Sequence, residues 1–166
     1  MNNEALSYVS RPFRPDRDLE LLVELHNQIE LSEDRPATLT TEQVKGSLDV
    51  PGLFRWVVDA DGSTHELAGY GVLYQQMPAR CYGDARVHPA WRRRGIGRVL
   101  IDALAEKTAE LGSRYLAIDV NHDNQDAIRF LLTQGFRYRG DVWALLLPAG
   151  IELPRLEWPN GYTVRH

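Results

Sequence analysis

Arg92-Arg93-Arg94-Gly95-Ile96-Gly97-Arg98 is the stretch that decides the fold, and it leads from an expected strand into an expected helix. It is a poor helix start, because it offers no Ser, Thr, Asp or Asn cap and places four arginines at the positive end of the helix dipole. The conflict disappears if an anion caps the helix. Backbone N–H groups then point at phosphate oxygens, and the arginines add charge-assisted hydrogen bonds. A solvated basic loop is the alternative interpretation.

Two common phosphate-binding motifs do not fit this stretch. The third glycine of the dinucleotide fingerprint is replaced by Leu100, and no acidic residue follows at the distance that a ribose requires. A P-loop needs a Gly-Lys-Ser/Thr sequence, but the only lysines of the chain are Lys45 and Lys107. The anion is therefore expected to be held by a different loop.

Outward from this stretch, apolar spacing and turn signals predict helices and strands. Helices are expected to begin at Asp16, to open on a capping box of Thr40 and Gln43, and to cover residues 95–111 and 123–134. Strands are expected at residues 5–12, 53–59, 67–75, 79–87, 115–120, 136–141 and 142–147. The order β-α-α-β-β-β-α-β-α-β-β predicts an α+β fold, whose mixed, mostly antiparallel sheet carries helices on both faces.

The last residues differ in character from the rest. Residues 1–148 are expected to form one domain, and residues 149–166 a proline-rich tail or linker. A Tyr-x-x-Arg spacing begins at Tyr8 in the first expected strand and again at Tyr162 in the tail. The tail is either a native C-terminal arm or the first strand of a truncated second repeat.

Composition excludes several function classes. The 166 residues are 43% hydrophobic and 25% charged, as in an ordinary globular protein of one domain. The net charge of −4 argues against nucleic acid as a partner. Cys81 is the only cysteine, so an intrachain disulfide and a cysteine-based zinc site are excluded, and no metal is expected. The N-terminus lacks the apolar run of a signal peptide, and no stretch is long enough to span a membrane, so a cytoplasmic protein is expected.

The arginine stretch resembles the pyrophosphate loop of the GNAT N-acetyltransferase superfamily. The pattern of that loop is Gln/Arg-x-x-Gly-x-Gly/Ala, which corresponds here to Arg92, Gly95 and Gly97. It follows a strand that ends in Val-x-Pro, represented here by Val87 and Pro89. The loop motif therefore occurs at the place in the chain that the superfamily gives it.

A second element of the superfamily is also similar. Asn124-x-x-Ala127 is followed by Gly135-Phe136 at the usual distance, and the order of elements from Ala5 to Leu147 is that of the GNAT fold. Each motif alone is moderately specific. Both together, at the correct separation, identify the chain as a member of the superfamily.

The resemblance implies acetyl-CoA as cosubstrate. The backbone of Arg93 to Arg98 would hold the coenzyme pyrophosphate, the strand edge at Ala85 to Val87 would pair with the pantetheine arm, and Asn124 would bond the same arm. The alternatives are that Val87 is only a core residue and Asn124 only a first-turn helix residue. The implied coenzyme-binding residues are Ala85, Arg86, Val87, Arg92, Arg93, Arg94, Gly95, Ile96, Gly97, Arg98 and Asn124.

Members of the superfamily transfer the acyl group directly from the thioester to an amine. The amine must lose a proton, so a general base is expected, and an N–H near the strand end, that of Val87, would stabilise the developing oxyanion. Asp119 and Asp84 are the candidate bases, with solvated or paired carboxylates as the alternative for each. His26 lies on the apolar face of its helix and is expected to be a packed histidine.

One position departs from the pattern. Many members carry a tyrosine seven residues after the asparagine, which protonates the departing thiolate, but this chain has Leu131. Tyr138 and Tyr115 could substitute for it, although both are expected to be buried and structural. The function is then either an acyl-CoA-dependent N-acyltransferase or a non-catalytic coenzyme A-binding domain of a tandem protein similar to mycothiol synthase.

The acceptor is expected to be a primary amine of a small molecule or peptide. Residues 16–50 hold nine acidic and three basic residues, a charge of −6, whereas the rest of the chain carries +2. An acidic rim would favour a cationic acceptor, and a solvated helix face is the alternative. Because members of the superfamily often form dimers, a homodimer built by an added strand is a further expectation.

Overall fold

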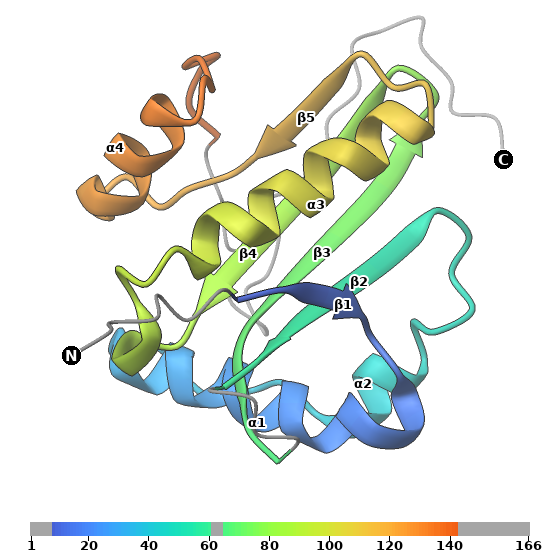
Figure 1. Ribbon diagram of the computed structural model, residues 1–166, viewed down its shortest axis with the longest axis vertical. Helices are drawn as coiled ribbons and strands as arrows, with labels where there is room; N and C mark the ends of the chain where they lie inside the picture. Colours follow the sequence, from blue (N-terminus) through green and yellow to red (C-terminus); the bar gives the residue numbers. More distant parts are fainter. Residues whose placement is uncertain (1–7, 61–64, 143–166) are drawn as a thin grey trace, which may run out of the picture.

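The computed structural model describes residues 8–60 and 65–142 (Figure 1). Five strands form one sheet in the order β1-β2-β3-β4-β5, with antiparallel neighbours except for the parallel pair β4 and β5. This confirms the predicted α+β fold with a mixed, mostly antiparallel sheet. In chain order the elements are β1 (Ser10–Pro12), α1 (Pro15–Ser32), α2 (Thr41–Lys45), β2 (Leu53–Asp59), β3 (Leu67–Met77), β4 (Arg80–Val87), the 3-10 turn η1 (Pro89–Trp91), α3 (Ile96–Glu110), β5 (Tyr115–Ile118) and α4 (Gln125–Thr133).

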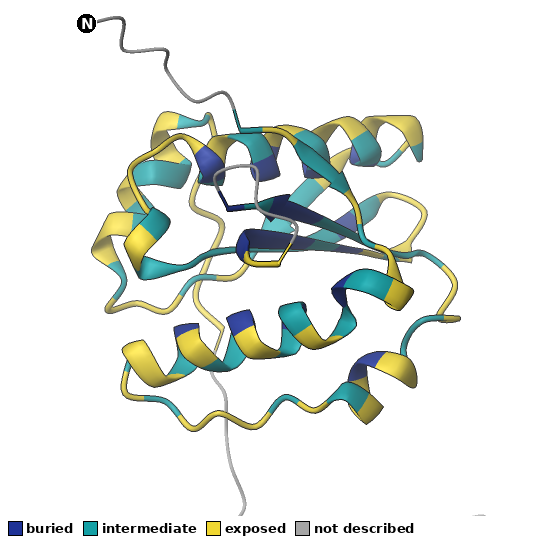
Figure 2. Cartoon of the chain, turned by 60° about the horizontal axis from the view of Figure 1, so that its bottom comes forward, coloured by how far each residue is buried: buried dark blue, intermediate teal, exposed yellow. Residues whose placement is uncertain are grey.

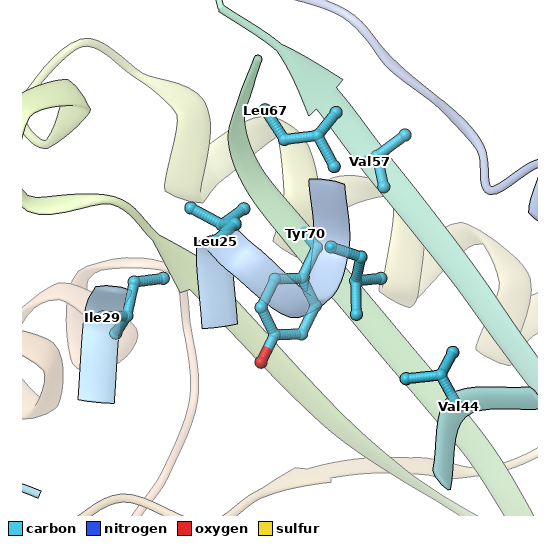
Figure 3. Close-up of a cluster of buried hydrophobic side chains, with 7 residues drawn as sticks. Leu25, Ile29, Val44, Val57, Leu67 and Tyr70 are labelled. Carbon is cyan, nitrogen blue, oxygen red and sulfur yellow. The ribbon is translucent and has the colours of Figure 1, made fainter. Parts of the chain in front are cut away.

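The helices bury apolar stripes against both faces of the sheet. On one face, Leu25 and Ile29 of α1 pack with Val44 of α2 against Val57 and Tyr70 (Figure 3). Figure 2 shows α1 and α3 on opposite sides of the sheet, with their buried positions turned toward it. On the α3 face the core residues are Val58, Ala68, Leu73, Cys81, Ile96, Leu100, Ile101 and Leu104.

The helix starts agree with the sequence in one case and differ in another. The capping box of Thr40 and Gln43 is present at the start of α2, as predicted. Helix α1 begins at Pro15, so the prediction that Asp16 caps it is wrong. The fully buried carboxylate of Asp18 satisfies this helix start instead. It accepts the backbone N–H of Arg14 at 2.7 Å and is paired with Arg11.

The predicted strand at residues 136–141 is not formed, since residues 136–142 have no regular secondary structure. Only the Phe136 side chain of this segment packs into the α3-side core, while Arg137 to Val142 are exposed. Alternating residues form a strand only where one face can be buried, and that burial is missing here. Residues 143–147 of the last predicted strand, the boundary at 148 and the tail lie outside the described residues.

Candidate active site

Strand β4 has an open edge in its second half. Residues Arg80 to Gly83 pair with β5, and among the described residues the pairing stops there. The N–H of His88 donates to the carbonyl of Ala68 on the β3 side, at 3.0 Å. Because the main-chain groups of alternate residues point to opposite edges, those of Ala85 and Val87 face the open edge. Figure 1 shows β5 separating from β4 in this direction, so an extended ligand can pair here as an added strand.

The start of α3 lies at the end of this edge and has free amide donors. Gly95 occupies the N-cap position in a left-handed conformation, with φ +87°, which glycine adopts without strain. The helix has no side-chain cap and no acidic residue in its first turn. Within the described residues, the N–H groups of Ile96 and Gly97 have no hydrogen-bond acceptor. Unsatisfied donors at the positive end of a helix dipole fit a phosphate group.

The backbone before the helix is curved in a way that suits an anion. Arg93 has φ +65°, an uncommon left-handed conformation for a residue other than glycine, and Gly95 repeats it two residues later. Alternation of left-handed and ordinary residues turns successive N–H groups toward one point. A Cβ atom at Gly95 would meet nothing within 4 Å, so the space beside this residue is open.

The arginine side chains of the loop are used differently. Arg94 lies over the ring of Trp91 at 4.5 Å, and Arg98 lies 3.7 Å from Asp102 of its own helix. Arg93 pairs with Asp126 of α4 at 2.9 Å, yet its side chain is 80% exposed. Such an exposed pair is weak, so the guanidinium of Arg93 can be shared with a ligand.

Arg92 is held by neighbours on two sides. Its Nε donates to the carbonyl of Val87 at 3.1 Å, and its Nη2 donates to Oε1 of Glu33 at 2.6 Å. The guanidinium therefore connects the loop to β4 and to the end of α1. Arg92 is one of the residues predicted to bind the coenzyme, and in the structure these two contacts fix its side chain against β4 and α1.

Asp84, one candidate base, lies on the α1 side of the open edge in a series of ion pairs. Its carboxylate accepts from Nε of Arg86 at 2.9 Å, and Arg86 Nη1 donates to Glu30 of α1. Glu30 also accepts from Nε of Arg35 at 2.6 Å. The side chain of Arg86, a residue of the strand edge predicted to pair with coenzyme, points to α1. Arg35 also pairs with Glu33, which in turn pairs with Arg92. These contacts form one series, here called the ion-pair chain: Asp84, Arg86, Glu30, Arg35, Glu33 and Arg92.

The arginines of this chain fix the charge of both glutamates. Hydrogen bonds from Arg35 and the charge of Arg86 outweigh burial and lower the pKa of Glu30 to about 2. Burial opposes the ionisation of Glu33, but hydrogen bonds from Arg92 and Arg35 still hold its pKa below its usual range. Both carboxylates are therefore ionised and already paired at neutral pH.

His26 and Tyr70 adjoin the ion-pair chain, a pairing that the sequence reasoning missed. His26 Nδ1 lies 2.7 Å from the hydroxyl of Tyr70, which stands opposite Arg86 in the β3–β4 register. Burial and the charge of Arg86 lower the pKa of His26, and burial and the charge of Asp84 raise that of Tyr70, so both are neutral near pH 7. His26 is half-buried, as the packed interpretation expected. A polar ring on an apolar helix face requires a buried partner, which was the available signal.

The other residues that the sequence singled out for catalysis or binding do not belong to the ion-pair chain. Asp119 is exposed directly after β5 and has no hydrogen bond or ion pair among the described residues. Asn124 caps α4, where its Oδ1 accepts the N–H of Ala127 at 3.0 Å. Leu131 packs into the apolar core on the α3 side. The expectation of buried tyrosines is wrong, since Tyr115 is 55% and Tyr138 74% exposed.

Residues 19–136 match the model of the acetyltransferase (GNAT) family. The chain belongs to this family. The match runs from α1 through both motifs to Phe136, so it includes the open edge of β4 and the start of α3. The resemblance inferred from the arginine loop is thereby confirmed.

Two curated relatives are mycothiol acetyltransferases. The protein of Saccharopolyspora erythraea is 29% identical over 128 residues, which cover 70% of this chain and 42% of the relative. That of Salinispora arenicola is 34% identical over 100 residues, which cover 60% of this chain and 31% of the relative. The chain therefore spans less than half the length of the curated relatives that it matches.

Solved structures share the fold at lower identity. An aminoglycoside acetyltransferase from an uncultured soil metagenomic sample, in complex with trehalose, has a TM-score of 0.69 and 17% identity, over 85% of this chain and 95% of that one. A Salmonella typhimurium protein with its cofactor acetyl-CoA has a TM-score of 0.68 and 19% identity, over 80% and 81% of the two chains. Likeness at these identities shows the fold alone. In the described residues, no helix is long and apolar enough to cross a membrane.

Proposed function

We propose that this chain transfers an acetyl group from acetyl-CoA to a primary amine of a small-molecule or peptide acceptor. The observation that carries the proposal is the position of the open β4 edge, which leads directly to the free amides of Ile96 and Gly97. One surface thus offers strand pairing for an extended arm and backbone donors for a diphosphate. Membership of the GNAT acetyltransferase family supports the same function.

The residues fit acetyl-CoA in a specific way. The concave backbone from Arg93 to Gly97 would hold the diphosphate, with the exposed Arg93 and Arg98 side chains adding charge. The main-chain groups of Ala85 and the carbonyl of Val87 would pair with the amide groups of the pantetheine arm. When bound, acetyl-CoA supplies a thioester, an acyl donor that reacts with neutral amines.

The chain's own groups then account for the rest of the chemistry. The Val87 N–H faces the open edge and donates a hydrogen bond to a carbonyl oxygen that gains negative charge. Asp84 accepts a proton from the acceptor ammonium, directly or through water. We choose Asp84 over Asp119 because it lies on β4 itself, three residues before Val87, and is held by Arg86.

The acceptor enters from the α1 side, where Asp84 lies. An aminoglycoside acetyltransferase of the same fold, solved in complex with sisomicin, supports a small polar acceptor. The ion-pair chain weakens the case for a cationic acceptor. Glu30 and Glu33 are already neutralised by arginines, so the acidic excess of residues 16–50 reaches the site less strongly than the sequence suggests. An amine with few charges therefore suits this site as well as a polycation.

The test combines cofactor binding with turnover. The full chain is titrated with acetyl-CoA, coenzyme A and ATP in a thermal shift series, and thiol release is then followed with a panel of primary amines that includes sisomicin. A shift of about 5–10 °C with both coenzyme forms, and none with ATP, is expected for ligand at about 100 times its dissociation constant. Asp84→Asn should lower kcat about 100-fold, and Asp119→Asn should leave it near wild type. No shift with any of the three ligands would refute the proposal.

A second candidate function is a coenzyme A-binding domain without turnover. Leu131 favours it, because an apolar core side chain occupies the position at which many family members carry a proton donor. General acid catalysis typically contributes about 10²–10⁴-fold, so its loss slows a reaction without abolishing it. Binding of acetyl-CoA combined with no acetylation of any amine in the panel would establish this second function over the first.

A further inference from the structure

The end of α1 carries acidic groups at a place where helix physics disfavours them. Glu30 lies in the last turn and Glu33 is the C-cap, and the last turn contains no basic residue. Acidic side chains at the negative end of the helix dipole cost about 0.3–1 kcal/mol each at exposed sites. Both are compensated by arginines from elsewhere, Arg86 of β4 and Arg92 of the loop, and by Arg35 between them.

The contact of Glu30 with Arg86 and that of Glu33 with Arg92 reach the two parts of the proposed acetyl-CoA site. Glu30 binds Arg86, whose Nε holds Asp84 at the open edge of β4. Glu33 binds Arg92, whose Nε also holds the carbonyl of Val87 beside the start of the loop. One helix end therefore touches both the strand with the candidate base and the loop that begins α3. The shared element suggests that each glutamate has a separate and measurable task.

We propose that Glu30 and Glu33 are positioning residues for acetyl transfer: Glu30 sets Asp84 through Arg86, and Glu33 sets the coenzyme loop through Arg92. This inference rests on the proposed function. The two glutamates are expected to affect different steps, which a purely structural role would not produce. Glu30 governs the acceptor side and the chemical step, whereas Glu33 governs the affinity for acetyl-CoA.

The burial of Arg86 explains why Glu30 matters. The Arg86 side chain is only 28% exposed, and two carboxylates share its charge. Without Glu30, the cation would be compensated by Asp84 alone, which would hold that carboxylate away from an incoming ammonium. The charged and titratable groups around this point are Arg86 and Asp84 of β4, Glu30 and His26 of α1, Tyr70 of β3 and Arg35.

His26 provides a readout that does not depend on turnover. The charge of Arg86 lowers the pKa of His26, while Glu30 and Asp84 raise it, with burial as the largest cause of the net decrease. Removing the negative charge of Glu30 should therefore lower the pKa of His26 further. The imidazole resonances of the full chain are titrated by NMR, with His26→Gln used to assign the signal. Glu30→Gln should lower the pKa of His26, and Glu30→Asp should restore it.

Glu24 is the matched control, because it is an exposed glutamate of the same helix whose single hydrogen-bond donor among the described residues is Gln28. Glu24→Gln should change neither the His26 titration nor the acetyl-CoA affinity. Calorimetry with acetyl-CoA completes the set. Glu33→Gln should weaken acetyl-CoA binding about 10-fold, and Glu30→Gln should leave it within about 2-fold of wild type.

Turnover then separates the two tasks. With the amine that wild type acetylates best, Glu30→Gln should lower kcat about 10-fold at an unchanged KM for acetyl-CoA, and Glu33→Gln should raise that KM at a nearly unchanged kcat. Identical His26 titrations and identical acetyl-CoA affinities in all variants would overturn the inference. Lack of turnover in wild type would refute the proposed function instead, and the titration and calorimetry would still decide whether the glutamates position Arg86 and the loop.

Discussion

Phe130 of α4 lies against Gly97 in the first turn of α3. A Cβ atom added at Gly97 would be 3.4 Å from Cζ of Phe130 and 4.0 Å from Cγ2 of Val87. The two family motifs, which are separate in the sequence, thus meet at one glycine. The lack of a side chain at this position lets the ring of Phe130 pack against the first turn of α3.

This contact gives a clear test of the phosphate site. Gly97 has no positive φ, and the space around its Cβ position is tight but passable, so Gly97→Glu and Gly97→Gln should both fold. The glutamate brings negative charge to the helix start, which should weaken acetyl-CoA binding about 100-fold, equal to about two charge-assisted hydrogen bonds. The glutamine has the same bulk without the charge and should weaken binding less. Calorimetry measures both, and equal losses would mean that bulk alone matters.

Asn124 offers a separation of stability from binding. Its Oδ1 caps α4 by accepting the N–H of Ala127, so Asn124→Ala should cost about 1 kcal/mol of unfolding free energy. Asn124→Asp keeps a capping oxygen but loses the amide donor proposed to bond the pantetheine arm. The aspartate variant should therefore unfold like wild type in urea and bind acetyl-CoA more weakly. If it binds equally well, Asn124 has a structural role only.

Local sequence signals predicted the elements that depend on their own residues. The strand Leu53–Asp59 and the capping box of Thr40 and Gln43 are of this kind, because turn residues and backbone caps act within a few positions. The start of α3 gave a signal of the opposite kind, since a helix that begins without a side-chain cap and beside four arginines favours a bound anion.

Ion pairs between residues far apart in the sequence could not be predicted. Glu30 and Arg86 are 56 positions apart, and Glu33 and Arg92 are 59, so no local pattern relates them. Residues 16–50 do carry an acidic excess, but arginines of β4 and of the loop pair with two of its carboxylates, so the excess does not by itself indicate a cationic acceptor. The prediction of a strand at residues 136–141 was wrong for a similar reason, because the local sequence does not show whether another part of the chain covers one of its faces.

The low pKa of Glu30 predicts how stability depends on pH. Its pKa falls from the usual 4.5 to about 2 on folding, so its ion pairs stabilise the fold fully above pH 4.5 and lose their effect as the pH falls toward 2. The melting temperature of Glu30→Gln should lie below that of wild type at neutral pH. The gap should shrink between about pH 4.5 and 2. Thermal unfolding by circular dichroism at several pH values measures it, and a gap that does not depend on pH would contradict the assignment.

Leu131 allows the missing proton donor to be restored. Its side chain is partly buried beside Ile101 and Leu104 of α3, in the cluster that also holds Phe130. If wild type turns over slowly because no group protonates the departing thiolate, Leu131→Tyr should raise kcat about 10-fold or more without changing the KM for acetyl-CoA. Leu131→Phe adds the same ring without a hydroxyl, so it separates proton donation from packing. Steady-state thiol release measures both variants, and an equal change in kcat for tyrosine and phenylalanine would exclude proton donation from this position.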